Sequence, residues 1–383
     1  MNSFDLFRTL VHARNGNPGE DSIENHYPIA ENVTKVGPDD IIVSDYETHR
    51  ADKAVAIVRN LGLSNQVTVT DGGKHQGWVW DKLLVKPQTH TGDHYRSDVE
   101  SPNQNYIKGI HCTQHNYTEA EQKLVELGFK NLALLCREAR LTTWSDDPKH
   151  RAIQVCQTNY NFPVLFMASV LLNRKNPTGN LIFSARDCFM WVRLMQAMYG
   201  RGEYWYTSCH ARINADANYE QYTQSFDLAG EGIVLVDLSG SGGSFTKLAE
   251  KNRVLFGNSV LMYKPLRFNA SNSVPALFQS QDVWRLEQCN RAPHQKCMGV
   301  DGAGQPIWLD RQCATAETSN LIEAQVKAFG RAVSLLDRYE LRPEKSLADV
   351  AYTAGMDWLL HRYIKFADAV EPLRQLDIAE DKE

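Results

Sequence analysis

Short apolar runs alternate with amphipathic stretches along the N-terminal part of the chain. The runs 41–46 (IIVSDY) and 66–73 (QVTVTDGG) end in polar or turn-forming residues, which is typical of buried strands. Stretches with apolar residues at helical spacing follow at 49–63 and 78–85, and a third strand tip and loop is expected within 88–99. Strands that alternate with helices predict a parallel sheet, with its functional loops at the carboxyl ends of the strands.

A similar alternation begins again near residue 160. A buried helix is expected at 161–173, strands at 180–187, 203–212 and 232–237, and helices at 188–200 and after a glycine-rich turn that follows Asp237. Beyond residue 275, we expect short strands at 282–289 and 305–310, helices at about 317–338 and 344–371, and a disordered tail at 377–383.

These patterns predict an α/β protein with two Rossmann-like parallel-sheet domains and a helical C-terminal extension. A length of 383 residues agrees with two domains rather than one. The expected boundaries are a first domain at 1–115, a helical linker at 116–150, a second domain at 151–275, and short strands followed by helices at 276–383.

Composition narrows the class of protein. The formal net charge is −5, whereas general nucleic-acid binders carry a basic face, so we expect no nucleic-acid partner. No stretch approaches the roughly 18 uninterrupted apolar residues that span a bilayer. The first residues also lack the basic-then-apolar layout of a signal peptide. We therefore expect a cytoplasmic protein without a membrane partner, and a homo-oligomer remains open.

The eight cysteines form no CxxC pair, which suits free thiols in a reducing compartment. The densest group consists of Cys289, His294 and Cys297, with Cys313 downstream. Their spacing matches no common zinc module, so a metal site and buried thiols both remain open.

Four polar motifs follow one another at predicted strand ends. They are Asp5 in SFDLFRTL, Ser44 in IIVSDY, Lys74 in GGKHQG, and the pair Asp93 and Asp98 in GDHYRSD. Each alone has an ordinary explanation, such as a helix cap, a surface charge or a turn former. Together they supply what a carboxylate needs to attack phosphorus: acidic ligands for Mg²⁺, a fixed positive charge and a hydroxyl for the phosphoryl oxygens.

This arrangement resembles the haloacid dehalogenase-like (HAD) superfamily. The resemblance implies that Asp5 is the nucleophile, Ser44 the phosphate-binding hydroxyl and Lys74 the charge-stabilising lysine. Asp93 and Asp98 would be the acidic pair that holds Mg²⁺ together with Asp5. The segment between Asp5 and Ser44 is loop-like and short for a helical cap, so the first domain is expected to carry a minimal cap.

One position departs from the family pattern. Phosphatases of this superfamily usually carry an aspartate two residues after the nucleophile, as the general acid for the leaving group, and here that residue is Phe7. Three interpretations stay open. The substrate has a good leaving group, one of His12, His90 and His94 acts as the acid, or phosphatase activity is weak or absent.

The segment VLVDLSGSGGSFTKL (234–248) is the second strong signal. Its Gly/Ser loop is pinned between an apolar strand and a helix, which favours an anion-binding loop over a flexible linker. It resembles the phosphate loop of type I phosphoribosyltransferases, and this implies that Asp237 lies near the ribose hydroxyls. Val236 stands where that family usually has a first acid. The residues that would bind the phosphate are Ser241, Gly242, Gly243 and Ser244.

Two arginines accompany the second domain's motifs at predicted strand ends. For Arg186 and Arg212, ligand binding and structural ion pairing are both open. The order of motifs over most of the chain resembles bacterial HAD-like proteins of glycan biosynthesis gene clusters.

Three functions remain open. The first is a Mg²⁺-dependent phosphohydrolase or phosphotransferase acting on a small phosphorylated sugar or nucleotide-like metabolite, with the second domain binding sugar phosphate. The second is a phosphoribosyltransferase-like glycosyl transfer in the second domain. The third is a degenerate, non-catalytic HAD scaffold or sensor.

Overall fold

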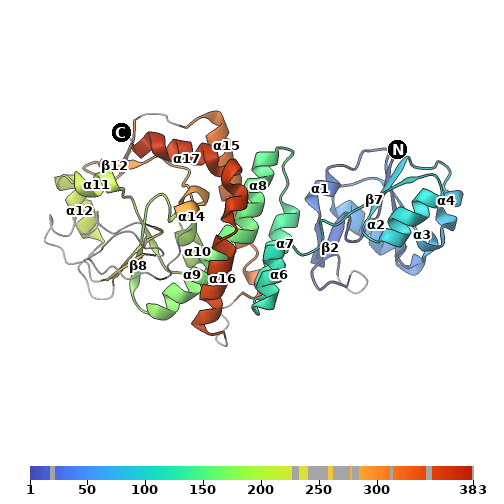
Figure 1. Ribbon diagram of the computed structural model, residues 1–383, viewed down its shortest axis with the longest axis horizontal. Coiled ribbons are helices and arrows are strands. Elements are labelled where there is room, and N and C mark those ends of the chain that lie inside the picture. Colours follow the sequence, from blue (N-terminus) through green and yellow to red (C-terminus); the bar gives the residue numbers. More distant parts are fainter. Residues whose placement is uncertain are drawn as a thin grey trace. The chain divides into compact units, whose positions relative to one another are not determined.

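The computed structural model describes residues 1–17, 22–226, 233–239, 258–261, 277, 284–310, 314–341 and 347–381 (Figure 1). Its contacts divide the chain into two compact units. The N-terminal unit comprises Met1–Thr118 and Arg137–Ser145, and the C-terminal unit comprises Glu119–Cys136 and Asp146–Glu383. Among the described residues, no helix is both long and apolar enough to cross a membrane.

A parallel sheet of five strands, in the order β5-β4-β1-β6-β7, forms the centre of the N-terminal unit. The strands are β1 (Ser3–Phe4), β4 (Ile41–Ser44), β5 (Gln66–Val69), β6 (Thr89–Gly92) and β7 (Lys108–His111). β1 is central because Ser3 pairs with Ile41 of β4 and with His90 of β6. The predicted strands in this part of the chain are confirmed, whereas β7 falls in a polar stretch without a strand signal.

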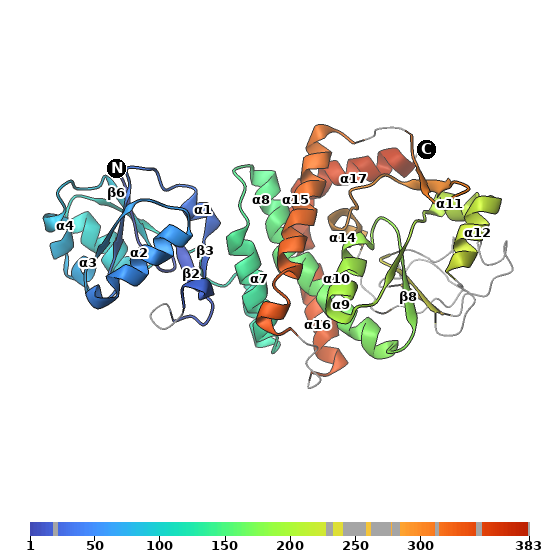
Figure 2. The same cartoon turned by 180° about the vertical axis from the view of Figure 1, so that it is seen from behind.

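Helices cover both faces of this sheet. Ile42 packs with Ile57 and Val58 of α2 (Ala51–Asn60), while its neighbours Ile41 and Val43 face Trp80 of α4 (Trp78–Lys82). Successive strand residues point to opposite faces, so a run of buried residues such as IIV requires cover on both sides. Figure 2 shows α2 and α4 on the N-terminal unit, together with α3 (Gly73–Gln76).

The segment between β1 and β4 is more ordered than the loop expected from the sequence. β2 (Val11–Ala13) and β3 (His26–Pro28) pair as an antiparallel hairpin, and α1 (Ala30–Val33) follows it. The hairpin is too short to show clear alternation in the sequence, and the buried side chains of Val11, Tyr27 and Ile29 hold it on the unit.

The C-terminal unit contains a second parallel sheet. Its strands β8 (Asn180–Ser184), β9 (Glu203–Trp205) and β10 (Ile233–Asp237) lie in the order β10-β8-β9, and β11 (Asn258–Leu261) pairs in parallel beside β10. The predicted strands at 180–187 and 232–237 are confirmed.

Helices make up most of the rest of this unit. They include α6 (Glu119–Glu126), α8 (Pro148–Cys156), α9 (Phe162–Lys175), α10 (Phe189–Tyr199), α12 (Ala217–Ser225), α15 (Ala316–Val333), α16 (Asp349–Leu360) and α17 (Ala367–Asp381), while α7 (Lys130–Thr142) contributes residues to both units (Figure 1). α9 is apolar on all sides and is buried over most of its length, as predicted. Both the α/β class and the helical C-terminal region are therefore confirmed.

Four sequence predictions in the C-terminal unit are wrong in detail. The strand predicted at 203–212 ends at Trp205, because Ser208 accepts a hydrogen bond from the amide of Ala211 and begins helix α11 (Cys209–Ile213). The predicted strand at 282–289 is helix α14 (Trp284–Cys289), since a short apolar run does not distinguish the two states.

The third error concerns the tail. Residues expected to be disordered belong to α17, which continues to Asp381. Val370, Leu373 and Leu376 recur at helical spacing and are buried, so one face of this helix packs on the unit. In the fourth error, a turn at Tyr363–Phe366 separates α17 from α16, where the sequence predicted a single helix.

Two helical glycines provide a matched test of the packing between α16 and α9. A Cβ added at Gly355 of α16 would lie 2.7 Å from Sδ of Met167, whereas one added at Gly330 of α15 would meet nothing within 4 Å. We expect Gly355→Ala to lower the free energy of unfolding by about 1–3 kcal/mol through overpacking. Gly330→Ala should raise it by about 0.5–1 kcal/mol through helix propensity. Denaturant titration measures both, and equal stability of the two variants would contradict this packing.

Candidate functional site

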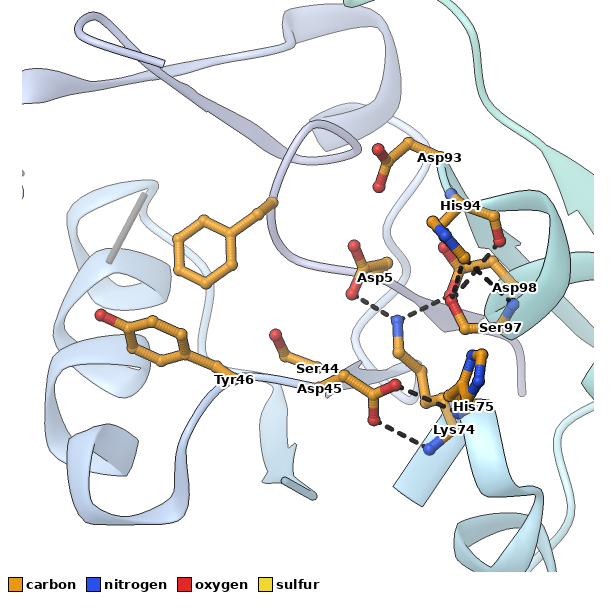
Figure 3. Close-up of a pocket in the computed structure, with 11 residues that line it drawn as sticks. Asp5, Ser44, Asp45, Tyr46, Lys74, His75, Asp93, His94, Ser97 and Asp98 are labelled. Carbon is orange, nitrogen blue, oxygen red and sulfur yellow. Dashed lines mark hydrogen bonds and ion pairs between the residues drawn. The ribbon is translucent and has the colours of Figure 1, made fainter. Parts of the chain in front are cut away.

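A pocket of about 330 Å³ lies where strands of the N-terminal sheet end (Figure 3). Asp5 directly follows β1, Ser44 is the last residue of β4, and Asp93 directly follows β6. These three strands are neighbours and parallel, so their carboxyl ends meet at one edge of the sheet. The lining residues are Asp5, Phe7, Ser44, Asp45, Tyr46, Lys74, His75, Asp93, His94, Ser97 and Asp98. All five N-terminal residues predicted from the sequence are therefore brought together.

The ammonium group of Lys74 joins two carboxylates in this pocket. Its Nζ lies 2.6 Å from Oδ1 of Asp5 and 2.7 Å from Oδ1 of Asp98, and the lysine is only 2% exposed. Burial opposes the charged form, but the attraction of Asp5 and Asp98 prevails and raises the pKa of Lys74. Lys74 is therefore a fixed positive charge rather than a proton donor.

Asp98 is held by hydrogen bonds to both of its oxygens. Oδ2 accepts from the amide of His94 at 2.8 Å, and Oδ1 accepts from Ser97 Oγ at 3.3 Å in addition to Lys74. Although burial opposes ionisation, Lys74 and His90 hold the pKa of Asp98 below its usual range. Gly92 makes room for this carboxylate, because a Cβ there would lie 2.3 Å from Asp98 Cγ.

His90 is a buried hydrogen-bond partner of Asp98. Its Nε2 lies 3.2 Å from Asp98 Oδ1 and its Nδ1 lies 2.9 Å from Ser3 Oγ. Burial lowers the pKa of His90 to about 4, so the ring is neutral near pH 7. Because an ionised carboxylate only accepts, the ring proton lies on Nε2 and Ser3 donates to Nδ1. His90 is fully buried and does not line the pocket, so it is no candidate for the missing acid.

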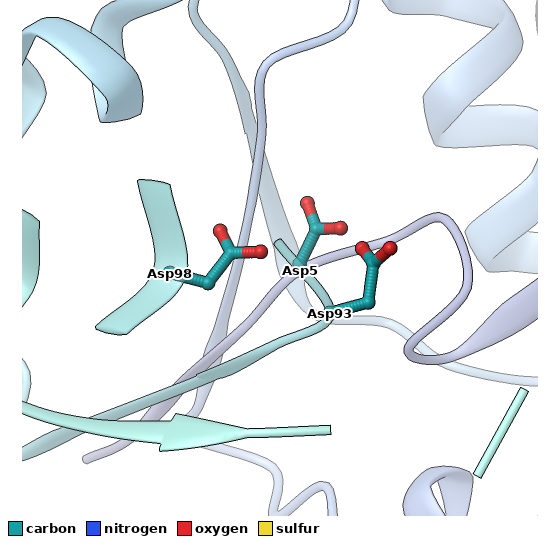
Figure 4. A group of neighbouring side chains, drawn as sticks. All are labelled: Asp5, Asp93 and Asp98. Atoms are coloured by element: carbon teal, nitrogen blue, oxygen red, sulfur yellow. The ribbon is translucent and has the colours of Figure 1, made fainter. Parts of the chain in front are cut away.

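Three carboxylates lie close together beside Lys74. Ligand oxygens of Asp5, Asp93 and Asp98 all lie within 4.8 Å of one another (Figure 4). Burial, followed by repulsion from Asp98, raises the pKa of Asp93. Burial also raises the pKa of Asp5, and Lys74 counteracts this in part. One lysine does not neutralise three acids, and a donor set of carboxylate oxygens is the kind that Mg²⁺ prefers, so these residues fit such an ion.

Asp45 positions the segment that carries Lys74, and the sequence analysis missed it. Its carboxylate accepts from the amides of Lys74 at 2.8 Å and His75 at 3.1 Å, and from the hydroxyl of Thr70. On the other side, Ser101 Oγ donates to the carbonyl of Lys74 at 2.6 Å. The available signal was an acid directly after Ser44, at the end of a buried strand.

Phe7 occupies one wall of the pocket. Its ring centroid lies 4.9 Å from that of Tyr46 in an edge-on contact and 5.8 Å from that of His26 in the hairpin. The following residue, Arg8, has a left-handed φ of 58° and places its guanidinium 3.9 Å from Asp93 Oδ2. The chain therefore turns sharply after Phe7.

The other histidines proposed as acids differ in position. His12 lies on β2, is buried and does not line the pocket, and burial together with Arg137 lowers its pKa to about 3. His94 does line the pocket, as does His75, which the sequence analysis missed. The two rings are 6.4 Å apart.

The residues predicted for the second domain are only partly described. Asp237 ends β10, and its Oδ1 accepts from Ser184 Oγ of β8 at 2.5 Å. Burial raises the pKa of Asp237 to about 6, although Arg212 attracts the charged form. Arg186 follows β8 with a left-handed φ of 69°, and its Nε lies 3.8 Å from Asp187 Oδ1. Ser241, Gly242, Gly243 and Ser244 lie outside the described residues.

The Cys/His group does not form a ligand cluster among its described members. Cys289 Sγ lies 3.5 Å from Cys156 Sγ, His294 Nε2 lies 2.7 Å from the hydroxyl of Tyr204, and Cys297 Sγ contacts the carbonyl of Gly299. In the part of the chain that the structure describes, Asp5, Asp93 and Asp98 are the residues grouped closely enough to hold a metal ion. Cys313 lies outside the described residues.

No protein-family model matches this chain, and no curated protein matches it. Functional inference therefore depends on the geometry of the residues themselves.

Replacing Lys74 by methionine tests the role of its ammonium. Breaking a buried ion pair costs about 3–5 kcal/mol, so we expect a loss of that order near pH 7 in EDTA. Without the ammonium, burial and mutual repulsion keep the folded-state pKa values of Asp5 and Asp98 above their unfolded values. The folded variant then binds more protons than the unfolded chain, so its stability falls as the pH rises, and the loss should be smaller near pH 5. Denaturant titrations at both pH values measure this.

The matched control is Lys108→Met, which removes an exposed lysine on β7 of the same unit. We expect this change to stay within about 0.5 kcal/mol. A Lys74→Met loss no larger than that of the control, or one that grows toward acid pH, would contradict the buried ion-pair network.

Proposed function

We propose that the N-terminal unit catalyses Mg²⁺-dependent phosphoryl transfer, with Asp5 as the nucleophile, on a small phosphorylated sugar or nucleotide-like metabolite. The observation that carries this proposal is the sharing of the Lys74 ammonium by Asp5 and Asp98, beside Asp93 in an open pocket. The order and placement of these residues also favour a Rossmann-like, HAD-type unit, which would make the protein a phosphohydrolase or phosphotransferase.

Each residue has a defined part in this chemistry. Asp5 forms the bond to phosphorus, and Lys74 reduces the repulsion between that carboxylate and the phosphoryl oxygens. Ser44 supplies a hydroxyl at the end of β4 to bind a phosphoryl oxygen, and Asp45 keeps Lys74 in place. Asp5, Asp93 and Asp98 would hold Mg²⁺, which neutralises charge on the phosphoryl group when bound.

A scaffold without catalysis remains an alternative because Phe7 replaces the usual acid. Against it stands the free-energy cost of the cluster. Close carboxylates repel one another and lose hydration on burial, and a purely structural unit gains nothing from two buried acids and a partly buried one within 4.8 Å of one another. The enzyme is therefore the better proposal.

We propose further that the C-terminal unit binds the sugar-phosphate end of a ligand near Asp237. A buried acid at the end of a parallel strand, hydrogen-bonded to Ser184 and attracted by Arg212, supports this assignment. Phosphoribosyltransferase-like glycosyl transfer in this unit is the alternative.

The nucleophile is tested by Asp5→Asn, which keeps the shape of the side chain and removes its charge. We expect Mg²⁺-dependent release of phosphate from p-nitrophenyl phosphate to fall by at least about 10³-fold, since the covalent step is lost. Asp81→Asn, an exposed acid on α4 that pairs with Lys86, is the matched control and should keep its activity. Full activity in Asp5→Asn would show that the nucleophile is assigned wrongly.

Metal binding is tested without any turnover. We expect MgCl₂ at about 100 times its dissociation constant to stabilise the folded protein by about 2.7 kcal/mol, seen as a rise in the thermal midpoint. Asp93→Asn should abolish this rise, because one of the three carboxylates becomes neutral, while Asp81→Asn keeps it. If Mg²⁺ leaves the midpoint of the wild type unchanged, the metal assignment fails and the scaffold gains support.

A further inference from the structure

We propose that this site accepts phosphoryl groups from donors whose leaving group departs as a stable anion, and that it turns over alkyl phosphate monoesters poorly. The donors of this kind are phosphoanhydrides and acyl phosphates. This inference rests on the proposed function and narrows its substrate class, because a simple sugar phosphate is an alkyl monoester. Its starting point is the wall of the pocket formed by Phe7.

Phe7 is a partly buried wall of the pocket and packs against the hydrophobic core of the unit. It lies two residues after Asp5, lines the pocket and packs edge-on against Tyr46, which is itself only 9% exposed. His26 of the hairpin contacts the same ring. A benzyl group carries no acidic proton, so Phe7 cannot protonate a departing oxygen.

Three of the polar side chains around Asp5 have partners. Lys74 binds two carboxylates, Ser97 donates to Asp98, and Ser97 Oγ also lies 3.2 Å from Nδ1 of His94. Figure 3 shows His75 and His94 near Lys74 and Asp98, across the pocket from Tyr46. The side of the pocket formed by Phe7 and Tyr46 presents a phenyl ring and a phenol, and neither is a carboxyl or imidazole group.

The reaction balances without a proton donor when the leaving group is an anion. A carboxylate oxygen of Asp5 forms a bond to phosphorus, and the bond from phosphorus to the leaving oxygen breaks. The leaving group keeps that electron pair and departs as a carboxylate or a phosphate, both stable near pH 7. Water then forms a bond to phosphorus, Asp5 leaves as a carboxylate, and the water proton passes to solvent. An alkoxide, by contrast, would have to be protonated as it departs.

A series of substituted phenyl phosphates, ordered by the acidity of their phenols, measures the need for an acid. We expect kcat/KM of the wild type to fall steeply as the phenol becomes less acidic. Phe7→Asp should flatten this dependence and raise kcat/KM for the least acidic phenol by about 10²-fold, because a positioned general acid contributes 10²–10⁴-fold. Phe7→Asn matches the aspartate in shape but carries no acidic proton, so its kcat/KM should still depend steeply on the acidity of the phenol.

The natural donors are compared in the same assay. Acetyl phosphate and pyrophosphate should release phosphate in an Asp5-dependent manner, and the better of the two identifies which leaving group the pocket takes. Ribose 5-phosphate should be turned over at least about 10²-fold more slowly, as the missing acid requires.

Several results would overturn this inference. A wild-type kcat/KM that varies little with the acidity of the phenol, or ready turnover of ribose 5-phosphate, would show that an acid is present. A steeper dependence in Tyr46→Phe, His75→Gln or His94→Gln would then identify that acid. A folded Phe7→Asp protein whose kcat/KM depends on phenol acidity as steeply as that of Phe7→Asn would show that this position does not face the leaving group.

Activity that survives Asp5→Asn is a different failure, because it rejects the assignment of the nucleophile and not that of the leaving group. If Phe7→Asp does not fold, the wild-type series decides alone.

Discussion

The N-terminal unit depends on one buried ammonium group that holds two buried carboxylates together. Lys74 lies between Asp5 and Asp98 and offsets part of the free-energy cost of burying these two acids. The surroundings are arranged to keep that lysine in place. Asp45 binds the backbone of its segment. His90 and Ser97 contact the same oxygen of Asp98 as Lys74 does, and the amide of His94 binds the other oxygen. The geometry of the pocket follows from this network.

The parallel sheet supplies the second constraint. Because β1 lies between β4 and β6, the residues at the ends of these strands meet without any long-range loop rearrangement. Asp5 therefore lies close to Ser44 and Asp93 although they are far apart in sequence. This explains why the clustering of these residues was predictable. Apolar runs that end in a polar residue mark strand ends, and the strand order of an α/β unit brings those ends together.

Other features could not be read from the sequence, for physical reasons. The β2–β3 hairpin and α11 are shorter than the window over which periodicity is measurable, and a single side chain, Ser208, decides where α11 begins. The positioning role of Asp45 arises from backbone amides that only the fold brings near. Phe7 was visible as a missing acid, but its contact with Tyr46 required the structure.

The absence of an acid at Phe7 also bears on the class of substrate. In the proposed phosphoryl-transfer site, Phe7 supplies no proton to the leaving group, which favours donors whose leaving group departs as an anion. The most direct test of the central claim is a crystal structure of the protein soaked with Mg²⁺ and beryllofluoride, a mimic of an aspartyl phosphate. We predict beryllium bonded to a carboxylate oxygen of Asp5, Lys74 hydrogen-bonded to a fluoride, and the metal bound by Asp5, Asp93 and Asp98. Beryllofluoride absent from Asp5, or bonded to a different carboxylate, would contradict its role as the nucleophile.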